Sequence, residues 1–184
     1  MTITFRALNH RDINYSKSID LFFEAFPKVQ RLPAWIVKYR MRKGMDGFYI
    51  ICEHNQWVGF IYTKEYKNIV SVKFFAISNL LRSNGYGSKV MDSMQKKYSE
   101  KRIVLTIEEL DEKEDNYQQR VKRKAFYEKN GFNSTGFIIR EPAERQEVFI
   151  RGGTISLEEV EAMYKYFLGN LMFSLLKIKV LKIK

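Results

Sequence analysis

The stretch Val72–Met91 contains the residues whose types and spacing best fit chemistry at a phosphate. An apolar run ends at Ile77, a polar segment with the spacing Arg82-x-x-Gly85-x-Gly87 follows, and helix periodicity then begins. Backbone N–H groups at the start of a helix lack intrahelical acceptors and point to one place, where the helix dipole adds positive potential. Such an arrangement favours an anion such as phosphate.

The glycine spacing separates this stretch from two widespread phosphate loops. No Gly-Lys-Ser/Thr follows, as it does in a P-loop. The dinucleotide fingerprint needs a third glycine, and Arg82 stands where its first glycine should be. On these residues alone, a phosphate loop and an ordinary turn between a strand and a helix are equally good interpretations.

Composition and charge limit the class of protein. The chain has 184 residues, of which 45% are hydrophobic and 15% aromatic, so it is large and apolar enough for one folded domain with a proper core. Its formal net charge of +11 attracts polyanions, whether nucleic acid, membrane lipid or a phosphorylated cofactor. A generally basic surface kept for solubility explains the charge equally well.

The elements around the polar segment are predicted from hydrophobic periodicity. Strands are expected at Thr2–Leu8, Gly47–Glu53, Trp57–Thr63, Ile69–Ile77, Arg102–Ile107, Phe132–Arg140 and Glu147–Arg151, and helices at 19–26, from about 33, at 86–99, at 117–129 and from 157. The three strands after the second helix form an antiparallel meander, and the helical crossover makes the next strand parallel to the third of them. The order β-α-α-β-β-β-α-β-α-β-β plus a C-terminal helix predicts an α+β fold with a mixed sheet.

Several local signals refine this prediction. The segment His54-Asn55-Gln56 is a plausible tight hairpin connection. The helix expected from Pro33 presents Trp35, Ile36 and Tyr39, which we interpret chiefly as core aromatics. Ser156 and Glu159 form a predicted capping box at the start of the last helix. One cysteine and two histidines far apart in the sequence give no basis for a metal site.

A second motif changes the balance between the two interpretations of Val72–Met91. The segment Phe126-Tyr127-Glu128-Lys129-Asn130-Gly131-Phe132 resembles motif B of the GNAT superfamily of N-acetyltransferases, a helix with a tyrosine that ends in Asn/Leu-Gly-Phe. Arg82-x-x-Gly85-x-Gly87 resembles motif A of the same superfamily, about 40 residues earlier. The resemblance covers roughly 1–151 and implies the acyl-CoA N-acyltransferase fold for that domain, with a C-terminal helix and basic tail in 152–184.

The resemblance implies a binding site for acetyl-coenzyme A (acetyl-CoA). The residues it assigns to the cofactor are Phe75, Ala76, Ile77, Arg82, Ser83, Asn84, Gly85, Tyr86, Gly87, Ser88 and Asn130. The strand residues would bond the pantetheine arm, with the Ile77 N–H facing the thioester oxygen. The N–H groups from Arg82 to Ser88 would hold the pyrophosphate.

The implied chemistry is direct attack of an amine on the acetyl thioester, and it needs an acid and a base. Tyr127 occupies the place of the family's usual general acid, although an amphipathic helix also places core aromatics at such positions. Glu108 continues a strand and is our candidate base, while a solvated acidic loop is an equally good interpretation of 111–115. Many members have an asparagine before the tyrosine, where this chain has Arg120 and Arg123, which are expected either to bind phosphate or to face water.

The tail Asn170–Lys184 combines apolar residues with interleaved lysines. It is too short to span a bilayer. It fits a docked strand or a subunit contact of a homodimer, and it also fits contact with an anionic membrane surface.

The resulting hypothesis is a cytoplasmic, acetyl-CoA-dependent N-acetyltransferase whose acceptor is an amine of a small molecule or a protein. The N-terminus lacks a signal-peptide core, which is the basis for the expected location. One alternative is a basic RNA-associated protein, or an acetyltransferase acting on charged transfer RNA, which charge alone supports. Another is a catalytically silent protein that binds acyl-CoA.

Overall fold

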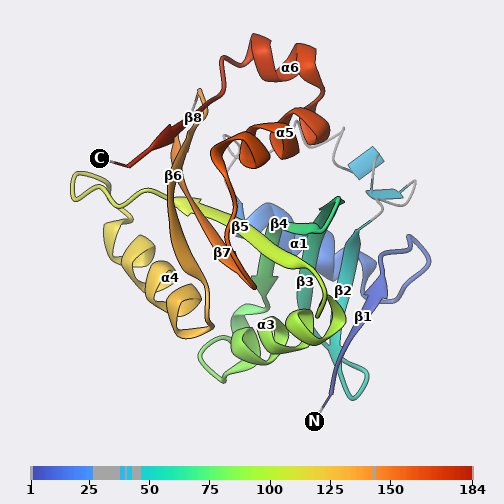
Figure 1. The fold of residues 1–184 in the computed structure, drawn as a ribbon. Helices are drawn as coiled ribbons and strands as arrows, with labels where there is room; N and C mark the ends of the chain where they lie inside the picture. Colours follow the sequence, from blue (N-terminus) through green and yellow to red (C-terminus); the bar gives the residue numbers. More distant parts are fainter. Residues whose placement is uncertain (1, 27–37, 40, 43–46, 143, 184) are drawn as a thin grey trace. The chain divides into compact units, whose positions relative to one another are not determined.

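The computed structural model describes residues 2–26, 38–39, 41–42, 47–142 and 144–183. Two compact units make up the chain, Met1–Lys64 with Val72–Lys97 and Glu65–Ser71 with Tyr98–Lys184, and each is described by itself. The hydrogen-bonded order of the eight strands is β1-β2-β3-β4-β5-β7-β6-β8 (Figure 1). The start of the predicted helix from Pro33 lies outside the described residues, whereas 38–39 and 41–42 are described and are helical.

The strands of the first unit are β1 (Ile3–Ala7), β2 (Phe48–Glu53), most of β3 (Gln56–Tyr66) and the greater part of β4 (Ile69–Ile77). β2 pairs antiparallel with β1 and with β3, so the first two strands of the predicted meander are present, and β4 lies next to β3 in the strand order. His54 and Asn55 connect β2 to β3 with φ of 47° and 66°. Two consecutive positive φ values are typical of a two-residue type I′ hairpin, which confirms the predicted tight turn.

An aromatic core joins the helix α1 (Tyr15–Ala25) to these strands. The Phe22 ring lies 5.0 Å from Phe74 and 5.9 Å from Phe60, and Phe60 stacks on Phe48 at 5.1 Å. The apolar face predicted for 19–26 therefore packs as expected. Tyr39 differs, because its side chain is 61% exposed and is not a core aromatic.

The helix α3 (Tyr86–Lys97) begins in the polar segment that follows β4. Its buried residues are Val90, Met91 and Met94, which the helix spacing of the sequence predicts. Figure 1 draws α3 in front of the strands of the first unit and α1 behind them. The rigid packing of this helix fixes the position of its N-terminal turn.

The second unit contains β5 (Arg102–Glu108), β6 (Asn133–Arg140), β7 (Arg145–Arg151) and β8 (Lys179–Lys182). β7 pairs antiparallel with β5 and β6, and β8 pairs antiparallel with β6. The helices of this unit are α4 (Tyr117–Lys129), α5 (Leu157–Leu168) and α6 (Asn170–Leu175). Its core is aliphatic, with Val104, Val148 and Val160 fully buried.

The predicted capping box at the start of α5 is present. The Ser156 hydroxyl accepts a bond from the Glu159 N–H, and the Ser156 N–H donates to the Glu159 carboxylate. Arg102 on β5 donates to the same carboxylate at 2.7 Å. These bonds lower the pKa of Glu159 to about 2, and the bond from Arg102 has the largest effect. The cap therefore also ties α5 to β5.

The tail forms α6 and β8. β8 extends the sheet by one strand beyond the predicted seven, with Val180 opposite Ile139 and Lys179 opposite Arg140. Ile178 and Val180 are buried in the core of the second unit. The docked-strand interpretation of the tail is thus confirmed for 179–182.

Two kinds of feature are absent from the described residues. None of the helices there has both the length and the apolar character needed to cross a bilayer. No group of three or more His, Cys, Asp or Glu side chains in the same part of the chain is arranged to hold a metal ion.

Candidate active site

The end of β4 leads into the loop that the glycine spacing indicates. A 3-10 turn at Asn79–Leu81 follows Ile77, and the Arg82 side chain turns back so that Nε donates to the Ile77 carbonyl at 3.1 Å. Ser83 and Gly85 then adopt φ of 63° and 78°. An L side chain rarely adopts such a conformation, so the glycine at 85 is needed for the turn that starts α3.

The start of α3 presents unpaired backbone donors. Lys89 N–H donates to the Gly85 carbonyl at 3.2 Å, which closes the first helical turn. Among the described residues, none of the backbone N–H groups from Ser83 to Ser88 makes a well-aligned hydrogen bond to a backbone carbonyl. Their residues are exposed or half-buried. A concave set of free N–H groups at a helix N-terminus binds anions such as phosphate.

Three side chains support the first turn of α3. Lys89 forms an ion pair with Glu53 at 3.0 Å, and its Nζ lies 4.7 Å from the centre of the Tyr86 ring. The bond from Lys89 lowers the pKa of Glu53, and the Tyr86 hydroxyl donates to the same carboxylate. These contacts tie the N-terminal turn of α3 to the end of β2.

A close approach between β3 and β4 shapes the strand before the loop. A Cβ atom built on Gly59 would lie 2.1 Å from the Ala76 carbonyl oxygen, so only glycine fits there. Beside this contact, the N–H of Ser78, which directly follows β4, donates to the Val58 carbonyl on β3 at 2.9 Å. Sequence reasoning missed Gly59, since a single glycine in a strand carries no specific signal. Phe75 is half-buried in this strand, and Ala76 and Ile77 are buried.

In the second unit, Tyr127 lies on α4 and is 9% exposed. The centre of its ring lies 5.0 Å from that of Phe126 and 5.6 Å from that of Phe132, and both ring pairs pack edge to face. Burial raises the pKa of Tyr127 to about 12, against the opposing effect of the positive charge of Arg123. The phenol therefore keeps its proton at neutral pH, and the same raised pKa makes it a weaker proton donor than an unshifted tyrosine.

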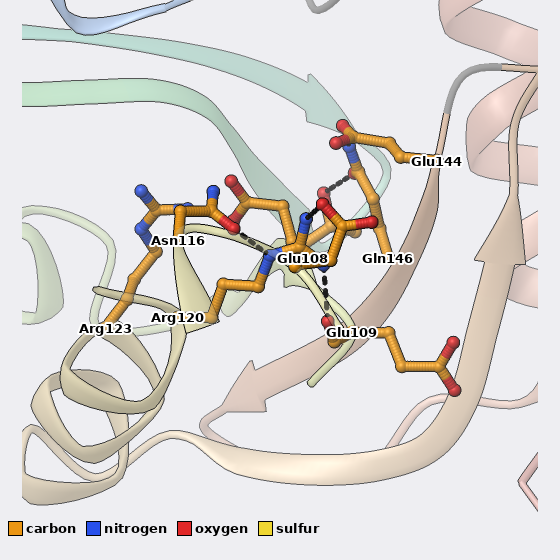
Figure 2. Close-up of polar contacts among 9 residues, drawn as sticks. Glu108, Glu109, Asn116, Arg120, Arg123, Glu144 and Gln146 are labelled. Carbon is orange, nitrogen blue, oxygen red and sulfur yellow. Dashed lines mark hydrogen bonds and ion pairs between the residues drawn. The ribbon is translucent and has the colours of Figure 1, made fainter. Parts of the chain in front are cut away.

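Glu108 is the last residue of β5 and is 8% exposed. Its carboxylate accepts a hydrogen bond from Arg123 Nη1 and forms an ion pair with it (Figure 2). Arg123 is therefore used within the protein, through a partner 15 positions earlier that the sequence expectation overlooked. Its expected contact with phosphate stays a prediction.

Arg120 is also used within the protein. It donates to the Asn116 side chain at 2.7 Å, to the Glu109 carbonyl at 2.8 Å and to Glu114 at 3.0 Å (Figure 2). These bonds fix the acidic segment onto the first turn of α4, and the Arg120 side chain is only 12% exposed, so it does not simply face water. Its expected contact with phosphate stays a prediction. The side chains of 111–115 are exposed, in agreement with a solvated acidic loop.

Neighbouring polar groups extend this cluster along the ends of β5 and β7. Gln146 lies opposite Glu108 in the ladder and bonds to Thr106 and Glu144 (Figure 2). Glu109 forms an ion pair with Arg145 at 2.5 Å. Hydrogen-bonded polar side chains thus converge at this end of the second unit.

Asn130 ends α4. Its Nδ2 donates to the Phe126 carbonyl at 2.7 Å, and its N–H donates to the carbonyls of the same turn. The side chain is buried and satisfies the helix terminus. Its assignment to the cofactor stays a prediction.

The structure groups the candidate residues in two sets. The strand and loop residues from Phe75 to Ser88 belong to the first unit, and Glu108, Tyr127 and Asn130 belong to the second. Within the second set, Arg123 pairs with Glu108, and its positive charge opposes the effect of burial on the pKa of Tyr127, four positions later on α4. Sequence reasoning did not find this role of the arginine.

Comparison with known proteins defines the class of this domain. Residues 45–134 match the family model described as an acetyltransferase (GNAT) domain. This segment contains both the loop at 82–88 and the helix with Tyr127. Residues 45–134 therefore form a GNAT acetyltransferase domain, and the predicted resemblance to that superfamily is confirmed. The roles of the individual motif residues stay predictions.

Solved structures share the fold. A GNAT-family acetyltransferase from Bacteroides thetaiotaomicron, described as putative, matches with 18% identity and a TM-score of 0.70 over 92% of this chain and 98% of the other. An aminoglycoside 6'-N-acetyltransferase complexed with coenzyme A matches with 16% identity and a TM-score of 0.58 over 82% and 96% of the two chains. Arabidopsis thaliana Naa50 in complex with a bisubstrate analogue matches with 18% identity and a TM-score of 0.54 over 83% and 100%. A search of curated proteins found no significant match.

Proposed function

We propose that this chain is an acetyl-CoA-dependent N-acetyltransferase that transfers the acetyl group to a primary amine of a small molecule or a protein. The observation that carries the proposal is the set of unpaired N–H groups from Ser83 to Ser88 at the start of α3. Two of the structures with the same fold contain coenzyme A or an analogue that includes it. The GNAT domain match supports the same class of reaction.

The donor residues fit the phosphates of coenzyme A. The N–H groups at the helix start would hold the pyrophosphate, because each free donor meets an anionic oxygen there. Gly85 gives the backbone the positive φ that aims these donors, and the first-turn Gly87 adds no side chain beside them. The backbone of Phe75 and Ala76 would bond the pantetheine arm, and the Ile77 N–H would donate to the thioester oxygen, where negative charge develops.

When bound, acetyl-CoA supplies an activated acetyl group as a thioester. In the proposed reaction the amine nitrogen forms a bond to the carbonyl carbon and the carbon–sulfur bond breaks. Tyr127 donates its proton to the departing thiolate sulfur, which a phenol that is neutral at pH 7 is able to do. The proton lost by the amine passes to Glu108 directly or through water.

The ion pair with Arg123 limits what Glu108 can do in the proposed reaction. A carboxylate whose charge is shared with Arg123 is a weaker proton acceptor than a free one, but it retains the negative charge that attracts a cationic amine. We therefore assign Glu108 two tasks, attraction of the protonated amine and acceptance of its proton. Arg123 would position this carboxylate.

Thiol release from acetyl-CoA, measured over a panel of small-molecule amines and peptides, tests the proposed reaction. We expect turnover with at least one amine and a mass increase of one acetyl group on that acceptor. The Tyr127→Phe variant should bind acetyl-CoA and lose most of its turnover. Binding of acetyl-CoA without turnover on any amine would instead support a catalytically silent acyl-CoA-binding protein.

A further inference from the structure

The C-terminal end of the second unit exposes an apolar surface next to lysines. Leu171 and Leu175 on α6 are 75% and 66% exposed, and Met172 and Leu176 are 46% and 38% exposed. The exposed lysines 177, 179 and 182 follow directly along the chain. Successive residues of a strand point to opposite sides of the sheet, so Lys182 shares the side of Val180, which packs with Phe173, and Lys179 does not. We call the four apolar residues together with Lys177 and Lys182 the leucine–lysine face.

Two buried side chains and a glycine turn fix the orientation of α6, and with it the leucine–lysine face. Phe173 and Ile178 are buried and anchor α6 and the start of the tail to the core of the second unit. Gly169, with φ of 82°, turns the chain between α5 and α6 (Figure 1). Because Phe173 occupies the inner side of α6, the neighbouring leucines cannot turn inward together. An apolar surface fixed in this way is typical of an interaction site.

Charge decides which partner fits the leucine–lysine face. No aspartate or glutamate occurs from 169 to 184, where four lysines are present. A two-fold contact between copies would bring the same lysines together, and lysines on the outermost strand oppose the addition of another strand. An anionic bilayer presents negative headgroups beside hydrocarbon, which matches lysines beside leucines.

We propose that the leucine–lysine face docks this protein onto the surface of an anionic phospholipid membrane. The α6 leucines enter the boundary between headgroups and acyl chains, and the lysines bind the phosphate groups of the lipids. α6 has only six residues, so the contact is peripheral and reversible. The proposal is independent of the acetyl-transfer reaction.

Co-sedimentation of the full-length protein with vesicles tests this proposal. We expect binding to vesicles of phosphatidylcholine and phosphatidylglycerol, no binding to phosphatidylcholine alone, and weaker binding as salt is raised. The double variant Leu171→Ser with Leu175→Ser should lose at least tenfold in affinity. Lys182→Gln should reduce the affinity roughly fivefold, the effect of one lysine near such a surface, and Lys179→Gln, on the other side of β8, should reduce it less.

A matched control replaces one exposed apolar residue by serine and one exposed lysine by glutamine at a different surface of the protein. Ile13 is 89% exposed and Lys17 is exposed, and both lie in the first unit, so Ile13→Ser with Lys17→Gln should leave vesicle binding unchanged. Thermal unfolding of every variant checks that the fold is kept. Absence of binding to the anionic vesicles, or an equal loss in the control, overturns the proposal. A dimer in solution that the leucine variant dissociates, with no vesicle binding, assigns the face to a second copy instead and also overturns it.

Discussion

Arg123 on α4 forms an ion pair with Glu108, the last residue of β5, and lies one helical turn before Tyr127 (Figure 2). The arginine thus joins the two side chains that the proposed reaction uses as base and acid. Because the Glu108 carboxylate is nearly buried, its charge needs this partner. Substitutions at these three positions should therefore have distinct effects.

Loss of the arginine should destabilise the protein through the carboxylate it leaves behind. Arg123→Gln should lower the free energy of unfolding by about 1–3 kcal/mol, less than for a fully buried pair because Arg123 is 40% exposed. The double variant with Glu108→Gln should recover part of that loss. Denaturant unfolding of the two single variants and the double variant measures the coupling, and additive losses would show that the pair contributes nothing.

Tyr127→Phe separates catalysis from stability. Removal of the acidic proton should reduce kcat by about 100-fold or more, while KM for acetyl-CoA stays the same. Phe126→Leu is the matched control, since it alters the neighbouring aromatic ring but no proton donor. Unchanged kcat in Tyr127→Phe, with intact folding, would contradict the role of the phenol as acid.

The pKa of Tyr127 also predicts a pH dependence. Burial raises this pKa from 10.0 to about 12, so the phenol is neutral throughout the range below 10. Because the folded protein favours the neutral phenol, Tyr127 contributes to the free energy of unfolding fully below pH 10, and this contribution is lost as the pH rises through 12. The rate at saturating substrate should therefore show no decline from this group below pH 10. An alkaline decline below pH 10 that Tyr127→Phe abolishes would contradict the assignment.

Glu159 predicts the opposite pH dependence of stability. Its pKa falls from 4.5 to about 2, so its contribution is complete above pH 4.5 and lost as the pH falls through 2. Glu159→Gln should lower the free energy of unfolding by about 1 kcal/mol at neutral pH, since it removes the ion pair with Arg102 and leaves a neutral acceptor in the capping box. The difference from the wild type should shrink as the pH falls from 4.5 toward 2. Glu161→Gln, in an exposed pair with Lys165, should change stability little at any pH, and an equal loss in both variants would contradict the role of the cap.

Local signals in the sequence predicted much of the fold. Ile69–Ile77 is rich in β-branched and aromatic residues and lies between polar segments, and the observed strand has the predicted bounds. The Ser156 and Glu159 cap and the His54-Asn55 turn were likewise predicted, because each depends on neighbouring residues only.

Long-range partners explain what the sequence did not show. Alternation of lysine with apolar residues in the tail is common to a docked strand and a surface segment, and only the pairing of β8 with β6 distinguishes them. The ion pair of Arg123 with Glu108 likewise depends on how α4 packs against β5. For the candidate site, motif spacing predicted the loop and the tyrosine, but not the arginine between the two proposed catalytic groups.

Titration calorimetry of acetyl-CoA tests the central claim most directly, with the wild type, Gly85→Ala and Gly136→Ala compared. Both glycines have similar φ, 78° and 74°, and open space where a Cβ atom would lie, so both substitutions strain the backbone by about 1 kcal/mol or more. Only Gly85 lies in the proposed pyrophosphate loop. We predict that the wild type and Gly136→Ala bind acetyl-CoA and that Gly85→Ala binds at least tenfold more weakly. Failure of the folded wild type to bind acetyl-CoA, or equal affinity in all three proteins, would contradict the assignment of this loop.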